Sequence, residues 1–99
     1  MPSRDAALEI RTLAQDPVPI RVRASGAWTF NGLKEPRLEL MQRLADLERQ
    51  PADHTAWDLT AVEELDDVGA AWLASALRKA KNIDVQPRHR EILDQVSQG

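Results

Sequence analysis

Alternating hydrophobic and polar positions near the start of the chain predict two strands. Leu8 and Ile10 alternate with charged neighbours, and residues 20–25 repeat this period of two, as half-buried strands do. The two prolines between these runs cannot donate ladder hydrogen bonds, so they favour a turn. We therefore expect an antiparallel hairpin, with its second strand ending at Gly26 and with Trp28 folding back over the core.

The next segment has the three- and four-residue spacing of an amphipathic helix. We expect this helix to run from about Glu35 to Arg49, after a cap at Asn31 and Gly32. Its apolar stripe consists of Leu40, Met41, Leu44 and Leu47.

Strands and helices alternate in the second half of the chain. Ala56–Leu59 has the pattern of a short buried strand, and Val62 and Leu65 fall in the acidic loop that we expect after it. From Val68 to Ala80 the residues are almost all apolar and small. This run predicts a helix that packs closely on the sheet.

A short strand around Ile83 and a helix beginning at Pro87 complete the chain. The predicted order is β-β-α-β-α-β-α, which indicates an α/β domain with a mixed four-stranded sheet and packed helices. Ninety-nine residues are enough for a single domain. We therefore expect residues 1–99 to form one domain, with a core over about residues 8–97.

Composition and charge exclude several classes of protein. Thirteen basic and 16 acidic residues give a net charge of −3, whereas nucleic-acid binders carry a basic excess to neutralise phosphates. The longest apolar stretch, 68–77, is far shorter than the about 20 residues that a membrane span needs. Cysteine is absent, which excludes disulfides, thiolate metal sites and cysteine nucleophiles. We expect a soluble domain that does not bind nucleic acid.

Motifs of enzymes and cofactor sites are also missing. The chain contains neither G-x-S-x-G nor a glycine-rich phosphate loop, and His54 and His89 have no neighbours at metal-ligand spacing. The acidic residues between 58 and 67 do not follow the calcium-loop pattern. We therefore expect no catalysis, no cofactor and no metal site, and solvated or capping roles for both histidines.

The most unusual segment is Trp57–Gly69, in which a strand leads through an acidic stretch into the start of a helix. We expect one of Asp66 and Asp67 to cap that helix by accepting backbone N–H groups, which is compatible with a partner contact at the same turn. Trp72 lies one position before Leu73 in this helix. Its ring fits either the core or a partner-facing anchor, and the sequence leaves both open.

This segment resembles the signature loop of STAS domains (sulfate transporter and anti-sigma factor antagonist), where a buried strand ends in a D-[ST]-[ST/A]-G turn that starts a helix. The element order predicted here is also that of the family, over essentially the whole chain. Within the family, three pieces are similar to the N-terminal cytoplasmic STAS domains of MlaE-type ABC-transporter permeases. They are SGAWT (25–29), WDLTAVEELDDVGAAWL (57–73) and PRHREIL (87–93).

The resemblance implies a non-enzymatic regulatory or protein-interaction module of a bacterial permease for phospholipid or hydrophobic compounds. The implied partners are the transporter's ATPase subunit and the permease's own transmembrane part, which would follow Gly99 in a longer protein. The module would lie on the cytoplasmic side of the inner (plasma) membrane. Two alternatives stay open: a free-standing STAS protein, either an anti-sigma factor antagonist or a separate transporter subunit, and a small-ligand binder with its crevice near Asp66.

The chain departs from the family pattern at one position of the turn. In switching STAS proteins a serine of this loop accepts phosphate from a partner kinase; the resemblance aligns Val68 with that serine, between Asp67 and Gly69. Val68 has no hydroxyl, so we expect a loop without the kinase switch. Asp67 supplies a fixed negative charge at a helix N-terminus, where an anion is favourable, and the sequence leaves open whether it mimics a phosphorylated state. The implied partner-binding residues are Asp66, Asp67, Val68, Gly69 and Trp72.

Overall fold

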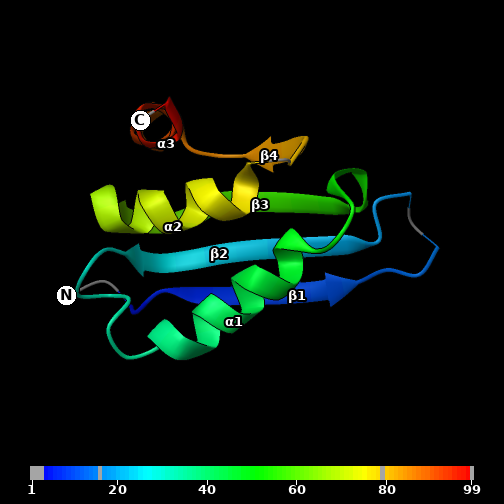
Figure 1. The fold of residues 1–99 in the computed structure, drawn as a ribbon, viewed down its shortest axis with the longest axis horizontal. Helices are drawn as coiled ribbons and strands as arrows, with labels where there is room; N and C mark the ends of the chain where they lie inside the picture. The colour runs from blue at the N-terminus through cyan, green and yellow to red at the C-terminus, as the bar shows by residue number, and fades with distance from the viewer. Residues whose placement is uncertain (1–3, 16, 79, 99) are drawn as a thin grey trace.

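Figure 1 shows the computed structural model, which describes residues 4–15, 17–78 and 80–98. Four strands form one sheet in the order β1-β2-β3-β4, and three helices pack against it. The elements are β1 (Ala7–Thr12), β2 (Ile20–Trp28), α1 (Arg37–Glu48), β3 (Thr55–Leu65), α2 (Asp67–Leu77), β4 (Asn82–Asp84) and α3 (Pro87–Gln98). The α/β order β-β-α-β-α-β-α predicted from the sequence is confirmed.

The sheet is mixed, as predicted. β1 and β2 form the antiparallel hairpin, whereas β2 with β3 and β3 with β4 are parallel pairs. α1 and α2 are the crossovers of these parallel pairs. Because such crossovers are almost always right-handed and both step across the sheet in the same direction, they cover the same face, as Figure 1 shows.

The core lies between this covered face and the helices. Its largest fully buried side chains are Trp28, Leu59, Leu73, Val22 and Val62. The Trp28 indole N–H donates to the Ser25 carbonyl at 2.9 Å, so the buried ring leaves no polar group unpaired. The opposite face of the sheet carries exposed charged side chains such as Arg21 and Arg23.

Two strands are longer than the sequence pattern indicates. β2 continues through Gly26, whose φ of +80° suits glycine, to the end at Trp28. β3 runs on to Leu65, so Val62 and Leu65 lie in a strand and not in a loop. Register shifts beside Arg23 and Gly26 absorb extra β3 residues, and these bulges break the simple alternation by which strands are recognised.

The bounds of two helices differ slightly from the predicted ones: α1 lies inside them, whereas α2 begins at Asp67, one residue before the predicted start. α1 begins after Pro36 with no side-chain cap, and Asn31 and Gly32 lie in the turn before it. Met41, predicted in the apolar stripe, is 52% exposed. α2 ends at Leu77, earlier than predicted.

The first turn of α2 sits directly on the end of β2. A Cβ atom built on Gly69 would overlap the backbone carbonyl of Trp28. Only a residue without a side chain allows this approach, so Gly69 fixes the distance between α2 and the sheet.

We predict that Gly69→Ala destabilises the fold by about 1–3 kcal/mol, because the added methyl group meets rigid backbone and one of the two elements must move. Chemical denaturation followed by circular dichroism measures this change. Val68→Ala, at the exposed neighbouring position, is the control and should change the unfolding free energy by less than about 0.5 kcal/mol. Equal stability of Gly69→Ala and the wild type would show that the contact is not tight.

Candidate functional site

The turn between β3 and α2 is held by the carboxylate of Asp66. Oδ1 accepts the Gly69 N–H at 3.0 Å, which makes Asp66 the N-cap of α2. Oδ2 accepts the Phe30 N–H, also at 3.0 Å. The Asp66 N–H donates to the Trp28 carbonyl at 3.3 Å. One aspartate therefore caps the helix, as predicted, and also joins it to the loop after β2.

The other residues implied by the resemblance lie around this cap. Asp67 is exposed in the first turn of α2, and Val68 is 38% exposed. Gly69 is buried against Trp28 and positions the helix. Trp72, one turn further along, is half-buried and packs against the core. Besides the capping Asp66, three of these five residues therefore have side chains that are at least partly exposed: Asp67, Val68 and Trp72.

Trp72 borders an apolar groove between α1, α2 and the loop after β2. The groove has a volume of about 580 Å³. Several of its side chains are strongly exposed: Phe30 by 60%, Leu38 by 70% and Met41 by 52%. We call it the Trp72 groove; its lining is Phe30, Leu33, Lys34, Arg37, Leu38, Met41, Val68 and Trp72.

The sequence did not indicate Phe30, Leu38 and Met41 as surface-site residues. Met41 fitted the helical stripe, although its exposure places it outside the core. Leu38 is apolar at a position off that stripe, which is the signal that could have marked an exposed apolar face. Phe30 lies in the loop after β2, which a hydrogen bond from the Phe30 N–H to Asp66 joins to the start of α2, a tertiary contact with no local sequence signal.

Two basic side chains, those of Lys34 and Arg37, line the Trp72 groove. Lys34 Nζ lies 5.3 Å from the centre of the Phe30 ring, in a cation–π arrangement. Arg37 is exposed in the first turn of α1, and Asp67 is exposed at the start of α2. The charged residues that line the groove are thus basic, and the carboxylate of Asp67 lies next to the lining residue Val68 in the chain.

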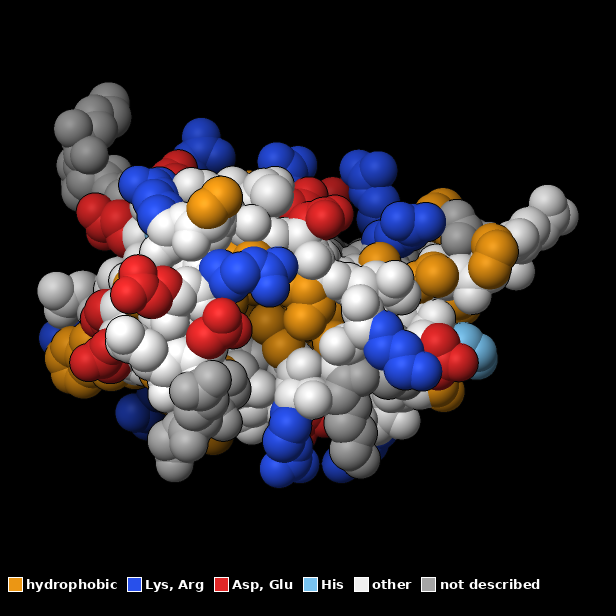
Figure 2. Space-filling model, turned by 90° about the horizontal axis from the view of Figure 1, so that it is seen from above, with side chains coloured by type: hydrophobic (Ala, Val, Ile, Leu, Met, Phe, Trp, Pro, Cys, Tyr) orange, Lys and Arg blue, Asp and Glu red, His pale blue; other side chains and the backbone are white. Residues whose placement is uncertain are grey.

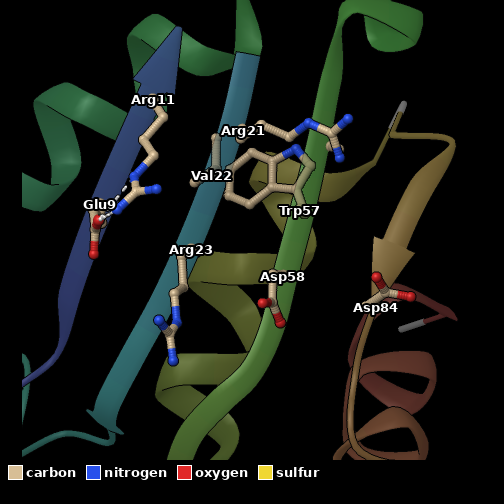
Figure 3. A pocket seen from close by; sticks show the side chains of 9 residues that line it. Glu9, Arg11, Arg21, Val22, Arg23, Trp57, Asp58 and Asp84 are labelled. Atoms are coloured by element: carbon tan, nitrogen blue, oxygen red, sulfur yellow. Dashed lines mark hydrogen bonds and ion pairs between the residues drawn. The ribbon is translucent and has the colours of Figure 1, made fainter. Parts of the chain in front are cut away.

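A second hollow, of about 290 Å³, lies on the uncovered face of the sheet (Figure 3). Arginines and carboxylates from different strands alternate along it; they include Arg11, Arg23, Asp58 and Asp84. Side-chain and backbone hydrogen bonds from Thr60 hold the pKa of the Asp58 carboxyl below its usual range. Because the two signs of charge are mixed, the hollow favours neither an anion nor a cation.

Figure 2 views the molecule onto the side that carries β4 and α3, and shows hydrophobic side chains gathered in a hollow between charged ones. A pocket of about 320 Å³ on this side is lined by residues that include Leu77, Ile83 and Leu93. These residues belong to the packing of α3 on α2 and β4, so the pocket is a shallow extension of the core.

His89 lies in α3 and is only 5% exposed, so the expectation of a solvated or capping role is wrong. Its Nδ1 atom is buried and makes no hydrogen bond within the part of the chain that the structure describes. Burial, with a smaller contribution from Arg88, lowers the pKa of His89 below its usual value of 6.5. The neutral ring is thus the form that fits the fold.

The described residues contain no group of three or more His, Asp or Glu side chains placed to hold a metal ion. Within the same ranges, no helix has the length and apolarity needed to cross a membrane. Comparison with models of known protein families, with curated proteins and with solved structures finds no match to the chain.

We predict that Asp66→Ala lowers the unfolding free energy by about 1–2 kcal/mol, because the helix loses its cap and the Phe30 N–H loses its acceptor. Asp67→Ala is the matched control. The Asp67 side chain makes no hydrogen bond within residues 4–15, 17–78 and 80–98, and we expect a change below about 0.5 kcal/mol. Equal effects of the two substitutions would contradict the assignment of the cap.

Stability should also depend on pH through His89. The unfolded state takes up a proton near pH 6.5, whereas the folded state does so only at lower pH. The unfolding free energy should therefore fall as the pH is lowered from about 7.5 towards the folded pKa, and level off below it. Thermal melts of His89→Gln should show a weaker loss over this range. His54→Gln, which removes an exposed histidine, should behave as the wild type.

Proposed function

We propose that this chain is a non-enzymatic protein-interaction module that binds its partner through the Trp72 groove and the Asp66–Gly69 turn. The observation that carries the proposal is the cluster of exposed apolar side chains beside the capped turn. Contiguous apolar surface of this kind marks interaction sites. Phe30 and Trp72 supply the large aromatic surfaces on which binding energy usually concentrates.

The resemblance to STAS domains of MlaE-type permeases suggests which partner this is. We propose the ATPase subunit of an ABC transporter for phospholipid or hydrophobic compounds, with the permease's own transmembrane part as a second contact. The module would then work on the cytoplasmic side of the inner membrane. The element order and the strand–turn–helix arrangement at Asp66 support this proposal.

The proposed contact is constitutive and does not depend on phosphorylation of the turn. Val68, at the position aligned with the family's phosphoacceptor, offers an apolar side chain to the groove. The neighbouring Asp67 carries its charge permanently, in the first turn of α2, where a helix favours an anion. Apolar contact in the groove supplies the affinity, and the charges on the rim orient the partner.

A binding measurement with the purified ATPase subunit encoded beside the gene tests the proposal. We expect Trp72→Ala and Phe30→Ser each to weaken binding at least tenfold, which corresponds to about 1.4 kcal/mol. Asp67→Lys should weaken it as well, because it reverses an exposed charge in the Asp66–Gly69 turn.

Leu13→Ser is the control, since Leu13 is an exposed leucine that follows the far end of β1 (Figure 1). It should bind like the wild type, and circular dichroism should show that all four variants are folded. Full affinity of the three groove variants would refute the proposed surface. Absence of binding by the folded wild-type chain would refute the proposed partner.

A further inference from the structure

β1 is an edge strand: β2 lies on one side, and the part of the chain that the structure describes places no strand on the other (Figure 1). Residues of an antiparallel ladder direct their backbone groups alternately towards and away from the neighbouring strand. The Leu13 N–H donates to the Pro19 carbonyl, so the odd-numbered residues bond to β2. The backbone groups of Leu8, Ile10 and Thr12 therefore point outward.

The outer edge is covered only at its beginning. Arg43 Nη1 of α1 donates to the Leu8 carbonyl at 3.0 Å. Beyond this contact, the outward N–H and C=O groups of Ile10 and Thr12 have no partner among the described residues. The Ile10 side chain is 40% exposed at the same place. β1 also has no proline and no bulge, two of the devices that protect such an edge.

We propose that a second copy of this chain pairs with this edge, antiparallel β1 to β1, with Ile10 opposite Ile10 of the second copy. The two sheets then continue as one eight-stranded sheet through a two-fold axis. In this register the outward backbone groups of Leu8, Ile10 and Thr12 face those of Thr12, Ile10 and Leu8. The Leu8 carbonyl has a second lone pair, so it can accept a ladder hydrogen bond while it keeps Arg43.

The charges on the uncovered face select the register. Glu9 and Arg11 both point to this face from β1, where they form an exposed ion pair at 3.3 Å (Figure 3). With Ile10 at the centre, each Glu9 lies opposite Arg11 of the other copy. A ladder centred on Glu9 or on Arg11 would place like charges face to face, which destabilises an antiparallel pair.

The charges on the neighbouring strand β2 also favour this register. In the β1–β2 ladder Arg11 lies directly opposite Arg21, and Glu9 lies opposite Arg23. The side of β1 that faces β2 is therefore rich in positive charge. A second copy adds a carboxylate beside each Arg11, so that four charges of alternating sign line the junction.

Sedimentation equilibrium of the 99-residue chain between about 10 and 500 μM tests the proposal, because a short strand edge supports a weak, reversible dimer. The wild type should show a monomer–dimer equilibrium. Glu9→Arg and Arg11→Glu should each weaken association at least tenfold, since each places like charges across the junction. A mixture of the two variants should associate, because opposite charges then face each other in the heterodimer.

Asp84→Arg is the control. Like Glu9→Arg, it replaces a carboxylate on the uncovered face by a guanidinium, but at the opposite edge of the sheet, so it should dimerise like the wild type. Circular dichroism checks that each variant is folded. A wild-type chain that stays monomeric over the whole range would overturn the proposal. Three other results would also overturn it: a dimer unaffected by Glu9→Arg and Arg11→Glu, a mixture that stays monomeric, or equal dissociation by Asp84→Arg.

Discussion

The close packing of the first turn of α2 on the end of β2 is the constraint on which the rest of the structure depends. Gly69 lets the helix backbone reach the Trp28 carbonyl, and Asp66 holds the same turn by hydrogen bonds to Gly69 and Phe30. Leu73, one turn further along α2, is fully buried in the core. The Asp66–Gly69 turn also holds the loop that carries Phe30, and both segments contribute to the Trp72 groove.

The order of the strands determines which surfaces the molecule can use. β2, β3 and β4 follow one another across the sheet without reversal, so both crossover helices cover one face. Doubly wound sheets bind ligands in the crevice where the strand order reverses, and this sheet has no such point. The two surfaces proposed above as contacts, the Trp72 groove and the outer edge of β1, are therefore not crevices of this kind.

Local patterns predicted the hairpin, the order of the elements and a cap at Asp66 or Asp67, because each depends on neighbours in the sequence. They did not predict the length of β3. Glu63 and Glu64 are exposed in the strand, and two consecutive charged residues favour the prediction of a loop. The bulges opposite β2 also disturb the alternation of apolar and polar residues. The groove was only partly predictable. Trp72 lies in the helix after the acidic turn, which the sequence marked as a possible contact, whereas Phe30 and Leu38 reach the groove through tertiary packing.

The bulge at Gly26 has a consequence for how far relatives of this chain can diverge. A Cβ at Gly26 would meet the backbone carbonyl of Asp5, just as one at Gly69 would meet that of Trp28. The last residues of β2 are thus enclosed by main chain from both sides, where no repacking of side chains can make room. Exposed helix positions outside the Trp72 groove can vary without this limit, whereas the two glycines and Asp66 should be retained wherever the fold is retained.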